Sequence, residues 1–182
     1  MNSAHNLSDY PISLPLLADD ILEFHASRLL LLLYICGKEG SVDSLTKMAK
    51  LDFFVRYPEF FASVCQSLNI TVQIPANSVE ATMIRYHYGP WDQRYYRILA
   101  YLEAKHLIKI NKSRKANILS LTEQGRNIAV QLEKEPPFWN LVEQMRLVKK
   151  ILGNRNGSNL KGLIYTLFDK QIASLAIGDK IV

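Results

Sequence analysis

The stretch from Met83 to Ala129 constrains the fold more than any other part of the chain. It begins with a tight aromatic turn at 86–91. A helical pattern follows, whose apolar residues recur at the spacing of one helix face: Tyr95, Ile98, Leu99 and Leu102. Two short apolar runs follow, 107–110 and 118–121, and a polar basic tip at 111–117 joins them. Such a pair of runs is typical of a β-hairpin.

A further helix is expected after the hairpin, because Thr122 suits its N-cap, although Gly125 in the first turn disfavours it. Helix, hairpin and helix in this order are the second half of a winged helix-turn-helix domain. The expected recognition helix spans about 92–106. Upstream, residues 20–37 predict a helix, capped by Asp19 or Asp20. It is apolar on all sides at its centre, so it forms either the core or half of a dimer interface.

These patterns predict a mainly α chain with a small β-hairpin, organised as a winged helix-turn-helix core with an N-terminal arm and C-terminal helices. The arm covers residues 1–18. The winged-helix domain covers 19–133, and its second helix is expected to start at the turn near 40–43 with Ser41 or Asp43 as the cap. An insertion near 59–79, which a minimal helix-turn-helix does not need, includes residues 70–74, whose alternation is that of a short strand. Residues 134–182 form a C-terminal helical extension. The apolar stripe of its last helix either packs on the rest of the chain, which we favour, or binds a partner.

Composition is that of a folded protein, with 48% hydrophobic and 21% charged residues in a chain of 182. The net charge is only +5, but positive charge gathers in the hairpin region, 107–126. That region should attract phosphate or an acidic protein surface, or it is simply a solvated turn.

The apolar run at 29–35 is too short to span a bilayer. Cys36 and Cys65 are expected to be buried thiols in a reducing cytoplasm.

No catalytic set stands out. The four histidines are scattered, and no phosphate-binding glycine loop or nucleophile motif is present. Asp19, Asp20, Glu23 and His25 could form a metal cluster, but acidic residues at a helix start are ordinary caps. We expect an interaction module, not an enzyme, with no cofactor and no metal.

The residues expected to contact a partner lie on the recognition helix and the hairpin tip. On the helix, 3.6-residue geometry turns four side chains away from the core, and these are Arg94, Arg97, Tyr101 and Lys105. The tip adds Lys112, Arg114 and Lys115. These side chains suit DNA phosphates and bases, and they suit the carboxylates of a protein partner equally well.

Two motifs carry a family resemblance. The first, K-L-D-F-F-x-R-Y-P, is formed around Lys50, Asp52, Arg56, Tyr57 and Pro58. The second is R-Y-x-Y-G-P-W-D, with Arg85, Tyr86, Gly89, Pro90, Trp91 and Asp92. Together with the run L-T-E-Q-G at 121–125, they resemble the middle component of bacterial ABC three-component systems, the group that includes Lamassu defence.

The resemblance implies a role in defence against phage or plasmid DNA. Such systems pair an SMC-like coiled-coil ATPase with an effector subunit, often a nuclease, and a small middle subunit. By this analogy the chain would be a non-catalytic winged-helix adaptor that contacts the ATPase heads and the effector, and double-stranded DNA as well. No contact with a membrane is expected. The alternative is a DNA-binding winged-helix transcriptional regulator.

The two arginines of the motifs lie among aromatic residues. Arg56 and Arg85 could stack against these rings and bind a partner. We favour instead an internal ion pair with Asp52 or Asp92, because an arginine inside an aromatic cluster usually needs a local partner.

Overall fold

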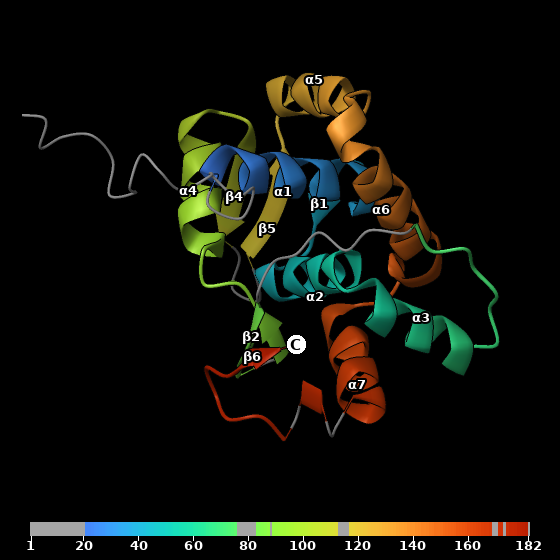
Figure 1. The fold of residues 1–182 in the computed structure, drawn as a ribbon. Coiled ribbons are helices and arrows are strands. Elements are labelled where there is room, and N and C mark those ends of the chain that lie inside the picture. The colour runs from blue at the N-terminus through green and yellow to red at the C-terminus, as the bar shows by residue number, and fades with distance from the viewer. Residues whose placement is uncertain are drawn as a thin grey trace, which may run out of the picture.

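The computed structural model describes residues 21–75, 83–87, 89–112, 117–168, 171–172 and 174–181. These residues form a mainly helical chain with two small antiparallel sheets, as Figure 1 shows. The elements follow in the order α1 (Leu22–Cys36), β1 (Ser41–Val42), α2 (Leu45–Arg56), α3 (Pro58–Ser67), β2 (Met83–Tyr86), β3 (Gly89–Trp91), α4 (Tyr95–Ala104), β4 (Ile108–Lys112), β5 (Asn117–Leu121), α5 (Glu123–Leu132), the 3₁₀ turn η2 (Pro136–Phe138), α6 (Trp139–Leu152), α7 (Gly157–Leu167) and β6 (Lys180–Ile181). The predicted mainly α class with a small hairpin is confirmed.

Helix α1 is the centre of the core. Its leucines from Leu29 to Leu33 are at most 1% exposed. Helices α2, α4, α5 and α6 all contact it, and Figure 1 shows them arranged around it. A helix that is apolar on every side can be stable only when it is surrounded in this way. Of the two alternatives for this helix, the chain's own core is therefore the one observed.

The first sheet has the strand order β1-β5-β4. The predicted hairpin is confirmed, with Ile108 opposite Leu121 and Lys112 opposite Asn117. Strand β1, only two residues long, pairs with β5 and was not predicted. A hydroxyl hydrogen bond of 2.9 Å from Ser41 to Ser120 links the same two strands.

The second sheet has the order β3-β2-β6. The sequence indicated only an aromatic turn here, but residues on both sides of the turn pair as strands, with Ile84 opposite Trp91. Strand β6 returns from the far end of the chain and places Ile181 opposite Met83. The Tyr57 hydroxyl accepts a hydrogen bond from the Met83 amide (2.9 Å) and donates one to the Ile181 carbonyl (3.2 Å). This tyrosine therefore ties α2 to the sheet.

Several local predictions were wrong at element boundaries. Ser44 caps α2, because its hydroxyl accepts from the Lys47 amide, whereas Ser41 and Asp43 were expected to do so. Residues 70–74 were expected as a strand, yet they have no strand partner among the described residues. Asp19 and Asp20 lie outside the described residues.

The C-terminal helices share the core with the rest of the chain. Helix α6 packs on α1 and α2, and α7 packs on α2 and α3. The Gln144 amide donates to the Phe54 carbonyl, and the Lys149 ammonium donates to the Cys36 and Gly37 carbonyls at the end of α1. On α7, Leu160 and Ile164 are fully buried. The prediction that this apolar stripe packs on the chain itself is confirmed.

Two helical glycines provide a matched test of these packing contacts. A Cβ at Gly125 in α5 would lie 1.9 Å from the Leu107 carbonyl oxygen, whereas a Cβ at Gly162 in α7 would meet nothing within 4 Å. Gly125→Ala should lower the free energy of unfolding by about 3 kcal/mol or more, because backbone must move. Gly162→Ala should raise it by about 0.5–1 kcal/mol. Urea unfolding followed by circular dichroism measures both, and equal effects would contradict the close packing of α5 against the Leu107 carbonyl.

Candidate functional site

A buried network of charged side chains joins the elements that carry the two motifs. Asp52 of α2 accepts from the hydroxyl of Tyr95 at 2.7 Å and forms ion pairs with Arg28 at 3.2 Å and Arg56 at 3.6 Å. The side chains of all three charged residues are fully buried. Arg56 also donates to Asp92 at 2.6 Å, across 36 positions of the chain. The predicted internal pairing of Arg56 is confirmed.

Asp92 extends this network to the start of α4. Its carboxylate accepts three hydrogen bonds of 2.9 Å from Arg94: one from the backbone amide and two from the guanidinium. The Arg94 guanidinium also lies 2.8 Å from the ring nitrogen Nε2 of His25 on α1. We call the set His25, Arg28, Asp52, Arg56, Asp92, Arg94 and Tyr95 the ion network. It connects α1, α2, the end of β3 and α4.

The ion network holds three arginines against two aspartates. Burial alone would raise the pKa of Asp92, but hydrogen bonds from Arg94 and the charge of Arg56 outweigh it and hold that pKa well below its ordinary value. Burial, reinforced by the charge of Asp52, raises the pKa of Tyr95. Tyr95 therefore stays a hydroxyl that can donate to Asp52.

Directly beside the ion network, aromatic rings form an exposed edge. The ring of Trp91 lies 5.1 Å from that of Tyr95 and 5.8 Å from those of Tyr86 and Tyr96. Tyr95 is fully buried, but Tyr96 is 66% exposed and Tyr86 is 37% exposed. We call Tyr86, Trp91 and Tyr96 the aromatic edge. Because the Tyr95 hydroxyl donates to Asp52, the ion network fixes the ring against which Trp91 packs edge to face.

The predicted contact residues of α4 divide into two groups. Arg94 was expected to point outward, and this was wrong: its guanidinium is held by Asp92 and is only 30% exposed. Arg97 and Lys105 are exposed, as expected, and Tyr101 is half-buried with the Lys105 ammonium 5.7 Å from its ring centre. Helix α4 spans Tyr95–Ala104, shorter than the expected 92–106.

The structure describes only some of the basic side chains that were predicted on the hairpin. Lys109 and Lys112 of β4 are exposed, whereas Arg114 and Lys115 lie outside the described residues. Glu103 of α4 accepts a hydrogen bond of 3.3 Å from the Ile110 amide, so α4 and β4 are directly joined. We call the exposed cations Arg97, Lys105, Lys109 and Lys112 the basic surface, a set that includes both faces of β4, because residues three apart on a strand point to opposite sides.

The remaining motif residues hold the backbone in place. Pro58 occupies the first turn of α3, where its missing amide hydrogen costs nothing. Gly89 has φ +104°, which favours glycine, and Pro90 faces Arg85 across the β2–β3 pair. Arg85 is half-buried and forms no ion pair with a described residue, so the expected pairing holds for Arg56 and not for Arg85.

Sequence reasoning missed three members of the ion network. Arg28 and His25 lie on the apolar first helix, and Tyr95 was assigned only to an apolar stripe. A signal was present, because an arginine within a helix that is apolar on all sides must find a buried acid. The sequence did not indicate which acid.

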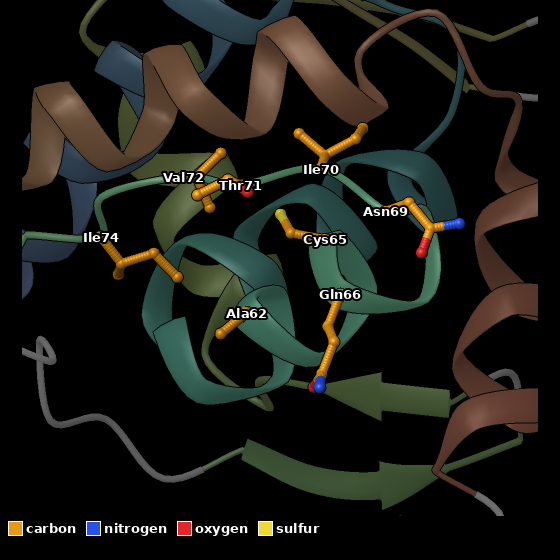
Figure 2. Close-up of a pocket in the computed structure, with 8 residues that line it drawn as sticks. All are labelled: Ala62, Cys65, Gln66, Asn69, Ile70, Thr71, Val72 and Ile74. Carbon is orange, nitrogen blue, oxygen red and sulfur yellow. The ribbon is translucent and has the colours of Figure 1, made fainter.

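A separate apolar cavity of about 430 Å³ lies along α3 and the segment that follows it (Figure 2). Its lining residues are Ala62, Cys65, Gln66, Asn69, Ile70, Thr71, Val72 and Ile74. None of them is charged. Burial raises the pKa of the Cys65 thiol, which therefore stays protonated and is a poor nucleophile. The cavity offers no catalytic set.

Within the described residues, no three His, Cys, Asp or Glu side chains come together in a way that could hold a metal ion. None of the described helices is both long and apolar enough to cross a bilayer. Comparisons of the chain with protein-family models, with curated proteins and with solved structures return no match.

Asp52 is the residue whose loss should damage the fold most. Asp52→Ala would leave Arg28 buried without its carboxylate and should lower the free energy of unfolding by about 3–5 kcal/mol. The matched control is Asp43→Ala, because Asp43 pairs with Lys47 at 3.7 Å but is 82% exposed. The control should stay within about 0.5 kcal/mol of wild type. Urea denaturation at pH 7 compares the two, and similar losses would contradict the role assigned to Asp52.

Asp92 should make stability depend on acid. Its folded-state pKa lies below the unfolded value of about 3.9, so its contribution is present above that pH and is lost as pH falls toward the folded-state pKa. Wild type should therefore exceed Asp92→Asn in urea midpoint at pH 6–7, and the gap should narrow steadily below about pH 4. A gap that is constant between pH 7 and pH 2.5 would show that the charge of Asp92 does not stabilise the fold.

Proposed function

We propose that the chain is a non-catalytic winged-helix adaptor of an SMC-like ATPase complex in anti-phage or anti-plasmid defence. The observation that carries the proposal is the ion network, because its members include Asp52, Arg56 and Asp92 from the two motifs on which the family resemblance rests. Two stretches that are separated in sequence thus serve one structural purpose. The resemblance is more persuasive when its residues act together than when they match singly.

The strand order supports the winged-helix assignment. In a winged helix, a short strand after the first helix pairs with the hairpin that forms the wing. Here β1 follows α1 and pairs with β5 of the β4–β5 hairpin. Helix α4 directly precedes the hairpin, in the position of a recognition helix. The region between α2 and α4 carries α3 and the β2–β3 pair, which a minimal helix-turn-helix does not have.

The exposed surfaces suit a protein that binds macromolecules. The aromatic edge presents Tyr86 and Tyr96 beside the exposed Arg97, and tyrosine, tryptophan and arginine are the residue types most enriched at binding hot spots. Because Trp91 packs edge to face against Tyr95, a member of the ion network, these rings are ordered before a partner binds. Such preorganisation lowers the entropy cost of association. We assign the ATPase heads to this edge.

The basic surface favours a second candidate function, that of a DNA-binding transcriptional regulator. Arg97, Lys105 and Lys112 are exposed and carry no ion pair with a described residue. Side chains of this type neutralise DNA phosphates. The two functions are compatible, because an adaptor can also hold DNA that passes through its complex.

Co-expression with the products of the neighbouring genes separates the two functions. For the adaptor, an SMC-like ATPase should co-elute with the chain in size-exclusion chromatography. The double variant Tyr96→Ala/Arg97→Glu should reduce the recovered complex at least tenfold, because it removes the exposed tyrosine of the aromatic edge and reverses the charge of the neighbouring arginine. The control Lys134→Glu/Lys150→Glu changes two exposed lysines elsewhere and should leave recovery unchanged.

Failure to recover any ATPase subunit would reject the adaptor. The isolated chain is then tested for duplex DNA binding by fluorescence anisotropy at several salt concentrations. Tight sequence-specific binding without the ATPase would support the regulator. The slope of the logarithm of the binding constant against the logarithm of salt concentration measures how many phosphates are neutralised. Replacing Lys105 and Lys112 by Ala should reduce the magnitude of this slope by about one unit for each lost phosphate contact.

A further inference from the structure

Helix α4 has one face that remains exposed to solvent. Its other side is buried and is formed by Tyr95, Ile98, Leu99 and Leu102. By 3.6-residue geometry, the exposed Ala100 and Ala104 lie in the middle of the open face, with Tyr96 on one side of them and Arg97 on the other. The distance between two packed helix axes depends on the side chains at the contact, so alanines at this position allow another helix to approach closely.

A positively charged row follows one side of this face. Arg97, Tyr101 and Lys105 are spaced by four residues, so their side chains lie along one line of the helix. Arg97 and Lys105 are exposed, and neither forms an ion pair with a described residue. Eight residues of helix separate them by about 12 Å along the axis. Two cations at a fixed separation are thus available to a partner.

Among the described residues, each acid next to this face already has a partner. The carboxylate of Glu103 accepts a hydrogen bond from the Ile110 amide. Asp92, before the helix, is 2% exposed and forms ion pairs with Arg56 and Arg94. These two acids hold α4 near its start and near its end. The face between them is therefore fixed in position and positively charged, which suits a negatively charged partner.

We propose that an acidic amphipathic helix of the ATPase heads packs along α4. Its small side chains lie over Ala100 and Ala104, an apolar side chain contacts Tyr96, and its carboxylates pair with Arg97 and Lys105. Both helices rise by 1.5 Å per residue, so the two carboxylates are about seven or eight residues apart in the partner. The identity of this partner rests on the proposed function, which assigns the ATPase heads to the aromatic edge.

The arrangement of charge favours a protein helix over a nucleic acid. Nucleic-acid sites usually gather lysine and arginine into one patch or stripe. The next cations after Lys105 are Lys109 and Lys112, and these point to opposite sides of β4, so the row does not continue as a stripe. The alanines at the centre of the face also have no side-chain donor for a phosphate or a base, whereas they leave room for a neighbouring helix.

Binding of the full chain to the co-expressed ATPase, measured by biolayer interferometry, tests the contact. Ala100→Arg should weaken binding about tenfold or more, because it fills the space that the partner helix needs while it adds positive charge. Arg97→Gln and Lys105→Gln should each weaken binding several-fold and reduce its salt dependence. Gln131→Arg adds the same charge at an exposed position of α5 and should bind as wild type does. Circular dichroism shows that each variant is folded.

Carbodiimide cross-linking of the same complex tests the charge of the partner directly, because the reagent joins a lysine to a carboxylate that lies in contact with it. Lys105 should form an amide bond with an Asp or Glu of the ATPase, which mass spectrometry identifies. Lys134, an exposed lysine between α5 and α6, should not. A second acid about seven or eight residues from the cross-linked one should be present in the ATPase sequence.

The outcomes separate this contact from the function on which it rests. Failure to recover any ATPase would reject the proposed function and, with it, the partner. If the ATPase is recovered, equal binding by Ala100→Arg and wild type, or cross-linking of Lys134 in place of Lys105, would overturn the acidic helix alone. A single-stranded and a duplex oligonucleotide are titrated in parallel. Tighter oligonucleotide binding by Ala100→Arg with unchanged ATPase binding would assign the face to nucleic acid and would also overturn the proposal.

Discussion

The ion pairs of Asp52 hold the centre of this molecule together. This buried carboxylate of α2 forms ion pairs with Arg28 of α1 and Arg56 of its own helix, and it accepts a hydrogen bond from Tyr95 of α4. Charges enclosed in a core are unfavourable unless their partners are correctly oriented. The network therefore restricts how α1, α2 and α4 can pack, where the surrounding leucines alone would tolerate several arrangements.

This restriction extends to the surface. Asp92 forms ion pairs with the buried Arg56 and with Arg94, two residues further along the chain. These two contacts fix the position of the start of α4. Tyr95 follows, and Trp91 packs against it edge to face. The exposed ring of Tyr96 is thus positioned by charges that solvent does not reach. These contacts order the aromatic edge, through which we propose that the chain binds a partner.

Local patterns were sufficient for the parts of the fold that local interactions build. The apolar run of α1, the hairpin of β4 and β5, and the Thr122 cap of α5 all follow from spacing within about a dozen residues. Strands β1 and β6 could not be predicted in this way. Each has two residues, too few for any alternation, and each exists only because a distant strand pairs with it.

The same division applies to the candidate site. The residue pattern was enough to predict that α1 must be enclosed and that a motif arginine such as Arg56 needs an internal acid. It was not enough to predict that Asp52 and Asp92 share this task or that Arg94 turns inward. These partners come from separate elements, so the distances between them depend on how the helices pack. Residue spacing along one element does not encode that packing.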